Sequence, residues 1–319
     1  MDEPAPISQS AEDSPSRLRT LLHLYADLVK LRLSMLVVFT AGVGCIMASG
    51  PTATIDWLLV LWTVVGTMAC AASANTINQI MEVRRDALML RTQGRPLPSG
   101  RLSSVHGWIV AVVLAYGGLT LLVLAVNIFA AGLALLTLLL YVLAYTPLKP
   151  VTTLNTLVGA VVGGVPPLIG WVAVRGQIDV GGWTLAAILF VWQLPHFLSL
   201  AWMYREQYEV AGFRMLPSVA GGERAVCEAA LLSTLLLIPL SLLVVTIHLA
   251  GVVYAVFALL LGLWFASKAF AFFRHRNHPT ARAAFLASLL YLPLLLLAMI
   301  LDRVPQVETI FVLLTPNSP

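Results

Sequence analysis

The chain has 319 residues, of which 59% are hydrophobic and only 11% are charged. A water-soluble domain could not divide such a composition between one core and its surface, so lipid is the expected solvent for most of the chain. The formal net charge of +4 does not indicate nucleic-acid binding, because the basic residues lie in loops and form no basic face with interleaved aromatic side chains.

The N-terminal segment, residues 1–25, is predicted to be a disordered cytoplasmic tail. Its first 20 residues are rich in Ser, Pro, Asp and Glu. No basic start leads directly into an apolar stretch, so a cleaved signal peptide is not expected. The membrane domain is predicted to cover residues 26–303, and residues 304–319 form a short C-terminal tail.

Nine apolar runs with short polar breaks follow, each suited to crossing a hydrocarbon core of about 30 Å. They predict an all-α bundle of nine transmembrane helices, arranged as two four-helix halves plus a ninth helix. Asp and Glu are absent from the runs, as expected from a cost of about 2.5–3.5 kcal/mol for a charge at a helix centre. The runs are 33–48, 57–80, 108–128, 130–146, 152–174, 183–203, 229–249, 252–273 and 283–300.

The distribution of Lys and Arg predicts the orientation. Of the 19 Lys and Arg, all but Arg175 and Arg303 fall on the side of the N-terminus and the even-numbered loops. The positive-inside rule therefore places the N-terminus and the polar loops in the cytoplasm and the C-terminus outside, in a bacterial cytoplasmic (inner) membrane. The three cysteines have no paired spacing and are expected to be buried thiols.

The end of the second run carries a candidate metal site. Asn78, Glu82 and Asp86 follow one another at steps of four, so they share one face if the helix continues past the membrane surface. One amide and two carboxylates suit Mg²⁺, which prefers oxygen ligands and keeps positions for phosphate. Arg91 and Arg95, also four apart, are suited to binding the phosphate oxygens.

The alternative for this segment is a solvated helix just outside the membrane. Glu82, Arg85 and Asp86 would then pair with one another at the surface, where such pairs contribute little. The spacing alone does not decide between the two interpretations.

Four blocks of sequence resemble the UbiA superfamily of intramembrane prenyltransferases, and within it the heme O synthase branch, the protoheme IX farnesyltransferases. In order, the blocks are Asn78-xxx-Glu82-xxx-Asp86-xx-Met89-x-Arg91-Thr92-xx-Arg95-Pro96, Tyr145-Thr-Pro-Leu-Lys149, Asn155-Thr-xx-Gly159 continuing to Gly170-Trp171, and Trp192-Gln-x-Pro195-His196 continuing to Pro217. The resemblance covers the chain from about residue 30 to residue 300 and implies a nine-helix bundle.

The resemblance also implies a reaction. The vinyl side chain of heme b attacks carbon one of farnesyl diphosphate, water is added, and heme O and diphosphate result, with Mg²⁺ as cofactor. The implied partners are farnesyl diphosphate, heme b and the lipid bilayer, and heme A synthase or terminal oxidase assembly proteins are candidates to receive the product.

Carried over by position, Asn78, Glu82 and Asp86 would act as catalytic Mg²⁺ ligands. The diphosphate would be bound by Arg91, Arg95 and Lys149, with Asn155 and Arg205 as further candidates. Two positions depart from the family pattern: Glu82 stands where many members have Asp, and Gln207 stands where the second motif usually has Asp. Glu206, also a catalytic candidate, and Glu209 are therefore the candidates for a second metal site.

His196 is the histidine that lies well inside a run, and an ionisable group there is a functional candidate. It could ligate heme iron, orient a propionate, or act as acid or base. The alternative is a neutral ring that is hydrogen-bonded across helices. Its place in the fourth block favours a role with heme.

Aromatic side chains are candidates for stabilising the allylic cation that forms when diphosphate leaves. They are Tyr141, Tyr145 and Trp192, although aromatic residues in membrane helices more often serve in packing. Gly159, Gly163 and Gly164 are of the small type that lets membrane helices approach closely.

Two other functions compete with this interpretation. A multispan anion transporter would place its binding groups near mid-membrane, whereas here the charges cluster at one surface. A prenyltransferase for another aromatic acceptor, such as a quinone precursor, shares the first site, but the block 192–217 favours heme.

Overall fold

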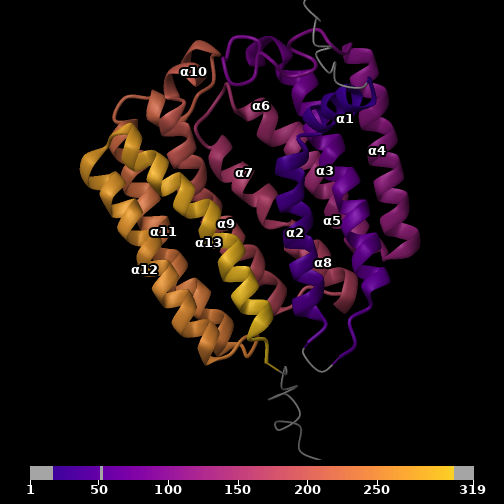
Figure 1. Cartoon of the computed structure of the whole chain (residues 1–319), viewed down its shortest axis with the longest axis vertical. Helices are drawn as coiled ribbons and strands as arrows, with labels where there is room; N and C mark the ends of the chain where they lie inside the picture. The colour runs from indigo at the N-terminus through magenta and orange to yellow at the C-terminus, as the bar shows by residue number, and fades with distance from the viewer. Residues whose placement is uncertain (1–16, 51–52, 305–319) are drawn as a thin grey trace, which may run out of the picture.

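The computed structural model describes residues 17–50 and 53–304, which are almost entirely helical (Figure 1). The predicted tails at 1–16 and 305–319 lie outside this part of the chain. In order, the elements are α1 Arg17–Leu28, α2 Leu31–Ala48, α3 Trp57–Asp86, α4 Ser104–Ala125, α5 Ile128–Leu139, η1 Leu140–Tyr145, α6 Thr146–Leu148, α7 Asn155–Gly164, α8 Pro166–Arg175, α9 Val180–Met203, α10 Arg205–Val210, η2 Leu216–Ser218, α11 Gly222–Thr246, α12 Val252–His275 and α13 His278–Leu301.

Within the described residues, nine segments are long and apolar enough to cross a membrane, which confirms the predicted number. The fourth is built from α5, η1 and α6, and the fifth from α7 and α8. The second is the longest, because α3 has 30 residues. At 1.5 Å per residue it spans about 45 Å, so it extends well beyond a hydrocarbon core of about 30 Å.

The first described helix corrects one prediction. α1 begins at Arg17, so residues 17–25, which we expected to be disordered, are helical. The reason is an amphipathic pattern in which Leu21, Leu22, Tyr25 and Leu28 recur at helical spacing.

The spans fall into two groups (Figure 1). α2 to α5 pack together on one side, and α9, α11, α12 and α13 pack together on the other. The fifth span lies between them, with α8 against α2 and α7 against α9. Two four-helix groups are therefore present, but the additional helix is the fifth span, which lies between them, and not the ninth as expected.

Glycine allows the close contact of α2 with α8. A Cβ atom at Gly170 would lie 1.9 Å from the carbonyl oxygen of Ala41, and one at Gly44 would lie 2.2 Å from that of Pro167. Both distances are far below van der Waals contact, so neither position accepts a side chain unless the helices separate.

The fourth span is irregular at the end that carries the polar loops. Residues Leu140–Tyr145 form a π-helical turn, and the backbone N–H of Thr146 donates to the carbonyl of Tyr141, five residues earlier. The Thr146 hydroxyl donates to the same carbonyl at 2.9 Å. Such turns re-aim side chains and are frequent at functional sites. Here the turn directs Tyr141 and Thr146 towards α3, which both side chains contact.

Candidate active site

The polar stripe of α3 is buried. Asn78, Glu82 and Asp86 are 0%, 5% and 1% exposed, and α3 runs without a break to Asp86. The helix therefore continues past the apolar run, as predicted, and all three residues lie on one face. The alternative of a solvated surface helix is wrong, because both carboxylates are almost fully removed from solvent.

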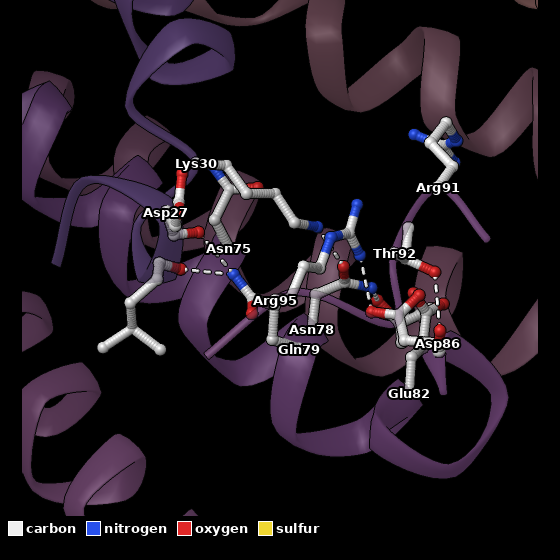
Figure 2. A network of polar contacts seen from close by, with 12 residues as sticks. Asp27, Lys30, Asn75, Asn78, Gln79, Glu82, Asp86, Arg91, Thr92 and Arg95 are labelled. Atoms are coloured by element: carbon white, nitrogen blue, oxygen red, sulfur yellow. Dashed lines mark hydrogen bonds and ion pairs between the residues drawn. The ribbon is translucent and has the colours of Figure 1, made fainter. Parts of the chain in front are cut away.

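Each residue of the stripe contacts a cation from a different segment, and Figure 2 shows the contacts of Lys30 and Arg95. Lys30, at the junction of α1 and α2, donates from Nζ to Asn78 Oδ1 at 2.5 Å. Lys149, just after α6, lies with Nζ 2.8 Å from Glu82 Oε1. Arg95, in the loop after α3, lies 2.5 Å from Asp86 Oδ2. Folding thus brings three cations from separate segments to the three oxygen-bearing side chains of one helix face.

The loop after α3 is held against the helix that precedes it. Thr92 is fully buried, and its hydroxyl donates to the carbonyl of Asp86 at 2.8 Å. The side chains of Met89 and Leu97 are also buried. These contacts turn the chain back so that Arg95 meets Asp86.

The amide of Asn78 has a defined orientation. Its Nδ2 donates to Thr146 Oγ1 at 3.2 Å, so its Oδ1 faces Lys30. The π-helical turn supplies Thr146 for this contact. The oxygen, which is the atom a metal ion needs, is thereby directed towards the cations.

Lys149 lies against aromatic rings as well as Glu82. Its Nζ is 4.6 Å from the ring centroid of Tyr145 and 5.9 Å from that of Phe213. Burial acts to lower the pKa of Lys149, but Tyr145 and Glu82 outweigh burial, so its pKa lies above the ordinary value. Lys149 is therefore a fixed positive charge at neutral pH.

Asn155 lies behind Lys149. Its side-chain nitrogen donates to the carbonyls of Thr152 at 2.6 Å and Arg214 at 3.0 Å. The backbone N–H of Arg214 in turn donates to the carbonyl of Lys149 at 2.8 Å. In this arrangement Asn155 holds the backbone around Lys149 in place.

Arg91 contacts α10 instead of the stripe. Its backbone N–H donates to Gln207 Oε1 at 3.3 Å, and its guanidinium donates to the Tyr208 hydroxyl at 3.3 Å. The guanidinium carbon also lies 5.2 Å from the ring centroid of Tyr204. Arg91 is exposed at the edge of the site, and Gln207 helps to hold it there.

The candidates for a second metal site lie apart from the stripe. The Glu206 side chain is 86% exposed and pairs with Arg205 at 3.6 Å, and Glu209 lines an open pocket of about 550 Å³. On α10, Gln207 and Tyr208 face Arg91, so Glu206 and Glu209 project from the opposite face. No group of three or more His, Cys, Asp or Glu that could hold a metal occurs in the described part of the chain.

His196 lies in a separate buried cluster between α9 and α13. Its ring stacks between Trp192 and Phe285, with centroids 5.0 and 4.8 Å away. Its Nδ1 is 2.8 Å from Ser288 Oγ. Trp192 belongs to this cluster and donates to the Ser288 carbonyl at 2.8 Å.

Comparisons with known proteins agree with this geometry. The sequence profile of the UbiA prenyltransferase family matches residues 37–295. The chain belongs to the UbiA prenyltransferase family. Together with the nine apolar helices, this makes it an integral membrane protein and a prenyltransferase.

Relatives of the chain in this family are named protoheme IX farnesyltransferases. The chain is 42% identical to the protoheme IX farnesyltransferase of Myxococcus xanthus over 91% of its own length and 99% of the relative. It is also 42% identical to the mitochondrial protoheme IX farnesyltransferase of Arabidopsis thaliana, over 88% of its own length. The chain spans 65% of the length of that plant protein.

Solved structures share the fold of this UbiA family member. A structure of digeranylgeranylglyceryl phosphate synthase matches with a TM-score of 0.73 and 21% identity, covering 88% of this chain and 98% of the other. A UbiA homologue from Archaeoglobus fulgidus bound to DMAPP and Mg²⁺ matches with a TM-score of 0.63 and 14% identity, covering 86% and 99%.

The sequence reasoning missed Lys30 and Thr146 as members of the site in this UbiA family protein. Lys30 was counted only among the cytoplasmic charges. A signal for it exists in the sequence, because Lys30 directly precedes the first span and so lies at the same membrane surface as Asn78. Thr146 belongs to the second block of sequence, but its contact with Asn78 depends on the π-helical turn.

Proposed function

We propose that this chain is a protoheme IX farnesyltransferase, which transfers the farnesyl group of farnesyl diphosphate to a vinyl group of heme b with addition of water. The observation that carries the proposal is the buried stripe Asn78, Glu82 and Asp86 with a cation on each member. Such a site suits a diphosphate with its metal, and the names of the relatives favour farnesyl and heme b as the pair of substrates.

Asn78, Glu82 and Asp86 would hold Mg²⁺. The donor set fits this ion, because it consists of one amide and two carboxylate oxygens on one buried face, with cations beside them for the phosphate oxygens. When bound, Mg²⁺ stabilises the negative charge that develops on the leaving diphosphate. Arg95 and Lys149, which contact Asp86 and Glu82, would bind its oxygens and contribute in the same sense.

The prenyl carbon would meet aromatic rings. Tyr145 lies under Lys149, and Tyr141 lies beside Tyr145 with ring centroids 5.1 Å apart. As the bond from carbon one to the diphosphate oxygen breaks, these faces stabilise positive charge on the allyl group. The vinyl group forms the new carbon–carbon bond, water adds to the cation that results on the vinyl carbon, and a proton is released.

His196 would bind heme b through Nε2. Ser288 Oγ donates its hydrogen to the Phe285 carbonyl at 2.6 Å, so towards His196 it can only accept. The His196 proton must then be on Nδ1, and Nε2 keeps its lone pair. No hydrogen bond to Nε2 is formed within the described residues, which leaves this atom available to heme iron.

The site would face the cytoplasm of a bacterial inner membrane. The Lys and Arg distribution supports this orientation, since 17 of the 19 lie on the side of the stripe. Farnesyl diphosphate would then present its headgroup at the cytoplasmic surface while its tail stays among the spans or in lipid.

Purified protein in detergent tests the proposal directly. Given heme b, farnesyl diphosphate and Mg²⁺, it should produce heme O, measured by chromatography, and should produce none when Mg²⁺ is chelated. The His196→Ala variant should fold but yield much less heme O, and its heme b spectrum should change. Unchanged yield in this variant would contradict the heme role of His196.

Two outcomes would favour the competing functions. Product with an aromatic acid, and none with heme b, would assign the protein to the prenyltransferases of quinone precursors. Absence of any prenylated product, combined with saturable uptake of an organic anion into proteoliposomes, would assign it to the transporters.

A further inference from the structure

Lys30 differs from the other cations of the stripe in its partner. Lys149 and Arg95 each pair with a carboxylate, whereas Lys30 contacts the neutral amide oxygen of Asn78. Within the described residues, no carboxylate lies within 4.0 Å of the Lys30 ammonium. An amide oxygen accepts a hydrogen bond but does not neutralise a charge.

The surroundings of Lys30 disfavour its positive charge. Lys30 is partly buried, and its ammonium donates to a neutral amide oxygen on the same stripe that Arg95 and Lys149 contact. A partly buried ammonium without a counter-ion is costly, and a polyanion among the three cations would remove that cost.

The backbone of Lys30 is held in an unusual conformation. Its φ is +49°, in the left-handed region that a side-chain-bearing residue rarely adopts. Gln79 holds this turn, because its Nε2 donates to the carbonyls of Asp27 at 2.8 Å and Leu28 at 2.7 Å (Figure 2). Such strain persists where surrounding contacts enforce it, commonly at functional sites.

The enforcing residue is adjacent to the stripe. Gln79 follows Asn78 directly on α3, so one turn of that helix both presents a candidate metal ligand and sets the end of α1. The Lys30 side chain then crosses to Asn78, as Figure 2 shows.

We propose that Lys30 is a third cationic ligand for the substrate diphosphate, positioned by Gln79. This inference rests on the proposed diphosphate site. Lys149 and Arg95 divide their charge between a carboxylate and the substrate, whereas the charge of Lys30 is available to the phosphate oxygens alone.

The competing explanation is structural. The contact of Lys30 with Asn78 could serve only to tie the junction of α1 and α2 to α3. If the contact is only structural, replacing Lys30 should lower the unfolding midpoint whether or not the new side chain is charged. If Lys30 binds the diphosphate, replacing it should weaken diphosphate binding unless the new side chain is also a cation.

The test compares three variants in detergent. Lys30→Met keeps the apolar length of the side chain without its charge, Lys30→Arg keeps the charge, and Arg32→Met removes an exposed charge two residues away. Binding of inorganic diphosphate with Mg²⁺ is measured by calorimetry, and the thermal unfolding midpoint is measured in parallel. We expect Lys30→Met to bind about 10- to 100-fold more weakly, as for loss of a charged hydrogen bond. Lys30→Arg should retain most of the affinity, and Arg32→Met should bind like the wild type.

A further variant tests the positioning role. Gln79→Met leaves the Lys30 charge in place but removes the contacts that hold its turn. It should weaken diphosphate binding while leaving heme b affinity unchanged, because His196 belongs to a separate cluster.

Two results would overturn the proposal. Equal diphosphate affinity in the wild type and Lys30→Met would exclude Lys30 as a ligand. Equal weakening in Lys30→Met and Lys30→Arg, with a lowered unfolding midpoint in both, would assign a structural tie. Neither result bears on the proposed reaction. That proposal is contradicted by a different outcome, the absence of heme O formation by the wild-type protein.

Discussion

Among the described residues, two carboxylates are buried, and each has its own cation. Asp86 is 1% exposed and meets Arg95, and Glu82 is 5% exposed and meets Lys149. A buried carboxylate without a partner would cost several kcal/mol. The pairing therefore makes the stripe compatible with folding and places the cations where a phosphate would need them.

At the scale of single residues, Asp86→Asn and Glu206→Gln compare the loss of a buried carboxylate with the loss of an exposed one. Asp86→Asn removes a buried carboxylate from the stripe, and we expect kcat to fall about 100-fold or more, the scale of losing one electrostatic contact in a catalytic site. Glu206→Gln alters a side chain that is 86% exposed, and kcat should stay within about twofold, as is usual for surface positions. Heme O formation by the two purified variants measures both.

The activity of Glu206→Gln decides whether the Glu206 carboxylate on α10 acts in the reaction. A large loss in Glu206→Gln would show that α10 turns towards the stripe during turnover. A small loss would leave Gln207 and Tyr208 as the residues by which α10 contributes, through their contacts with Arg91.

At the scale of elements, α3 and the fourth span build the site between them. α3 supplies the buried polar stripe of Asn78, Glu82 and Asp86 because it continues as one helix to Asp86. The fourth span supplies Tyr141, Tyr145 and Thr146 because its end is wound as a π-helical turn. α7 supports this turn from the other side.

Gly159→Ala tests that support. A Cβ at Gly159 would lie 2.7 Å from Cε2 of Tyr145, so the ring must move and its contact with Lys149 must change. We expect a loss of about 1–3 kcal/mol in stability, typical of overpacking, and a lower kcat for heme O formation.

Gly132→Ala in α5 is the matched control. A Cβ there would meet nothing within 4 Å, so stability and kcat should match those of the wild type. Equal behaviour of the two variants would show that the position of the Tyr145 ring does not matter for activity.

At the scale of the whole molecule, the polar loops and the site share one end. α1, the loop after α3, α6 and α10 all lie at the end of the bundle where the stripe is found (Figure 1). The loop between α8 and α9 lies at the other end. In the predicted orientation, this end of the bundle faces the cytoplasm.

Cysteine labelling in vesicles tests the orientation. The three native cysteines, Cys45, Cys70 and Cys227, are buried, so the wild type should not react with a membrane-impermeant maleimide. Ser99→Cys, in the exposed loop after α3, should react only in inside-out vesicles. Gln177→Cys, exposed between α8 and α9, should react only in right-side-out vesicles. The reverse pattern would show the opposite orientation.

The sequence by itself determined that the chain is a membrane protein, the number of spans in its described part, and the polar stripe on α3. These features depend on local patterns: apolar runs of membrane length, the side on which Lys and Arg fall, and the four-residue spacing from Asn78 to Asp86. The helix that begins at Arg17 could also have been predicted from a local pattern, since the sequence of α1 is amphipathic.

Only the tertiary structure decided which charges meet. Lys30, Arg95 and Lys149 reach the stripe from three segments, and no pattern within one segment specifies such a meeting. Glu206 and Gln207 are neighbours in sequence, yet on α10 the Gln207 side chain contacts Arg91, whereas the Glu206 side chain is exposed and pairs with Arg205. The reason is that spacing determines which residues share a face, whereas the packing of other helices determines what that face meets.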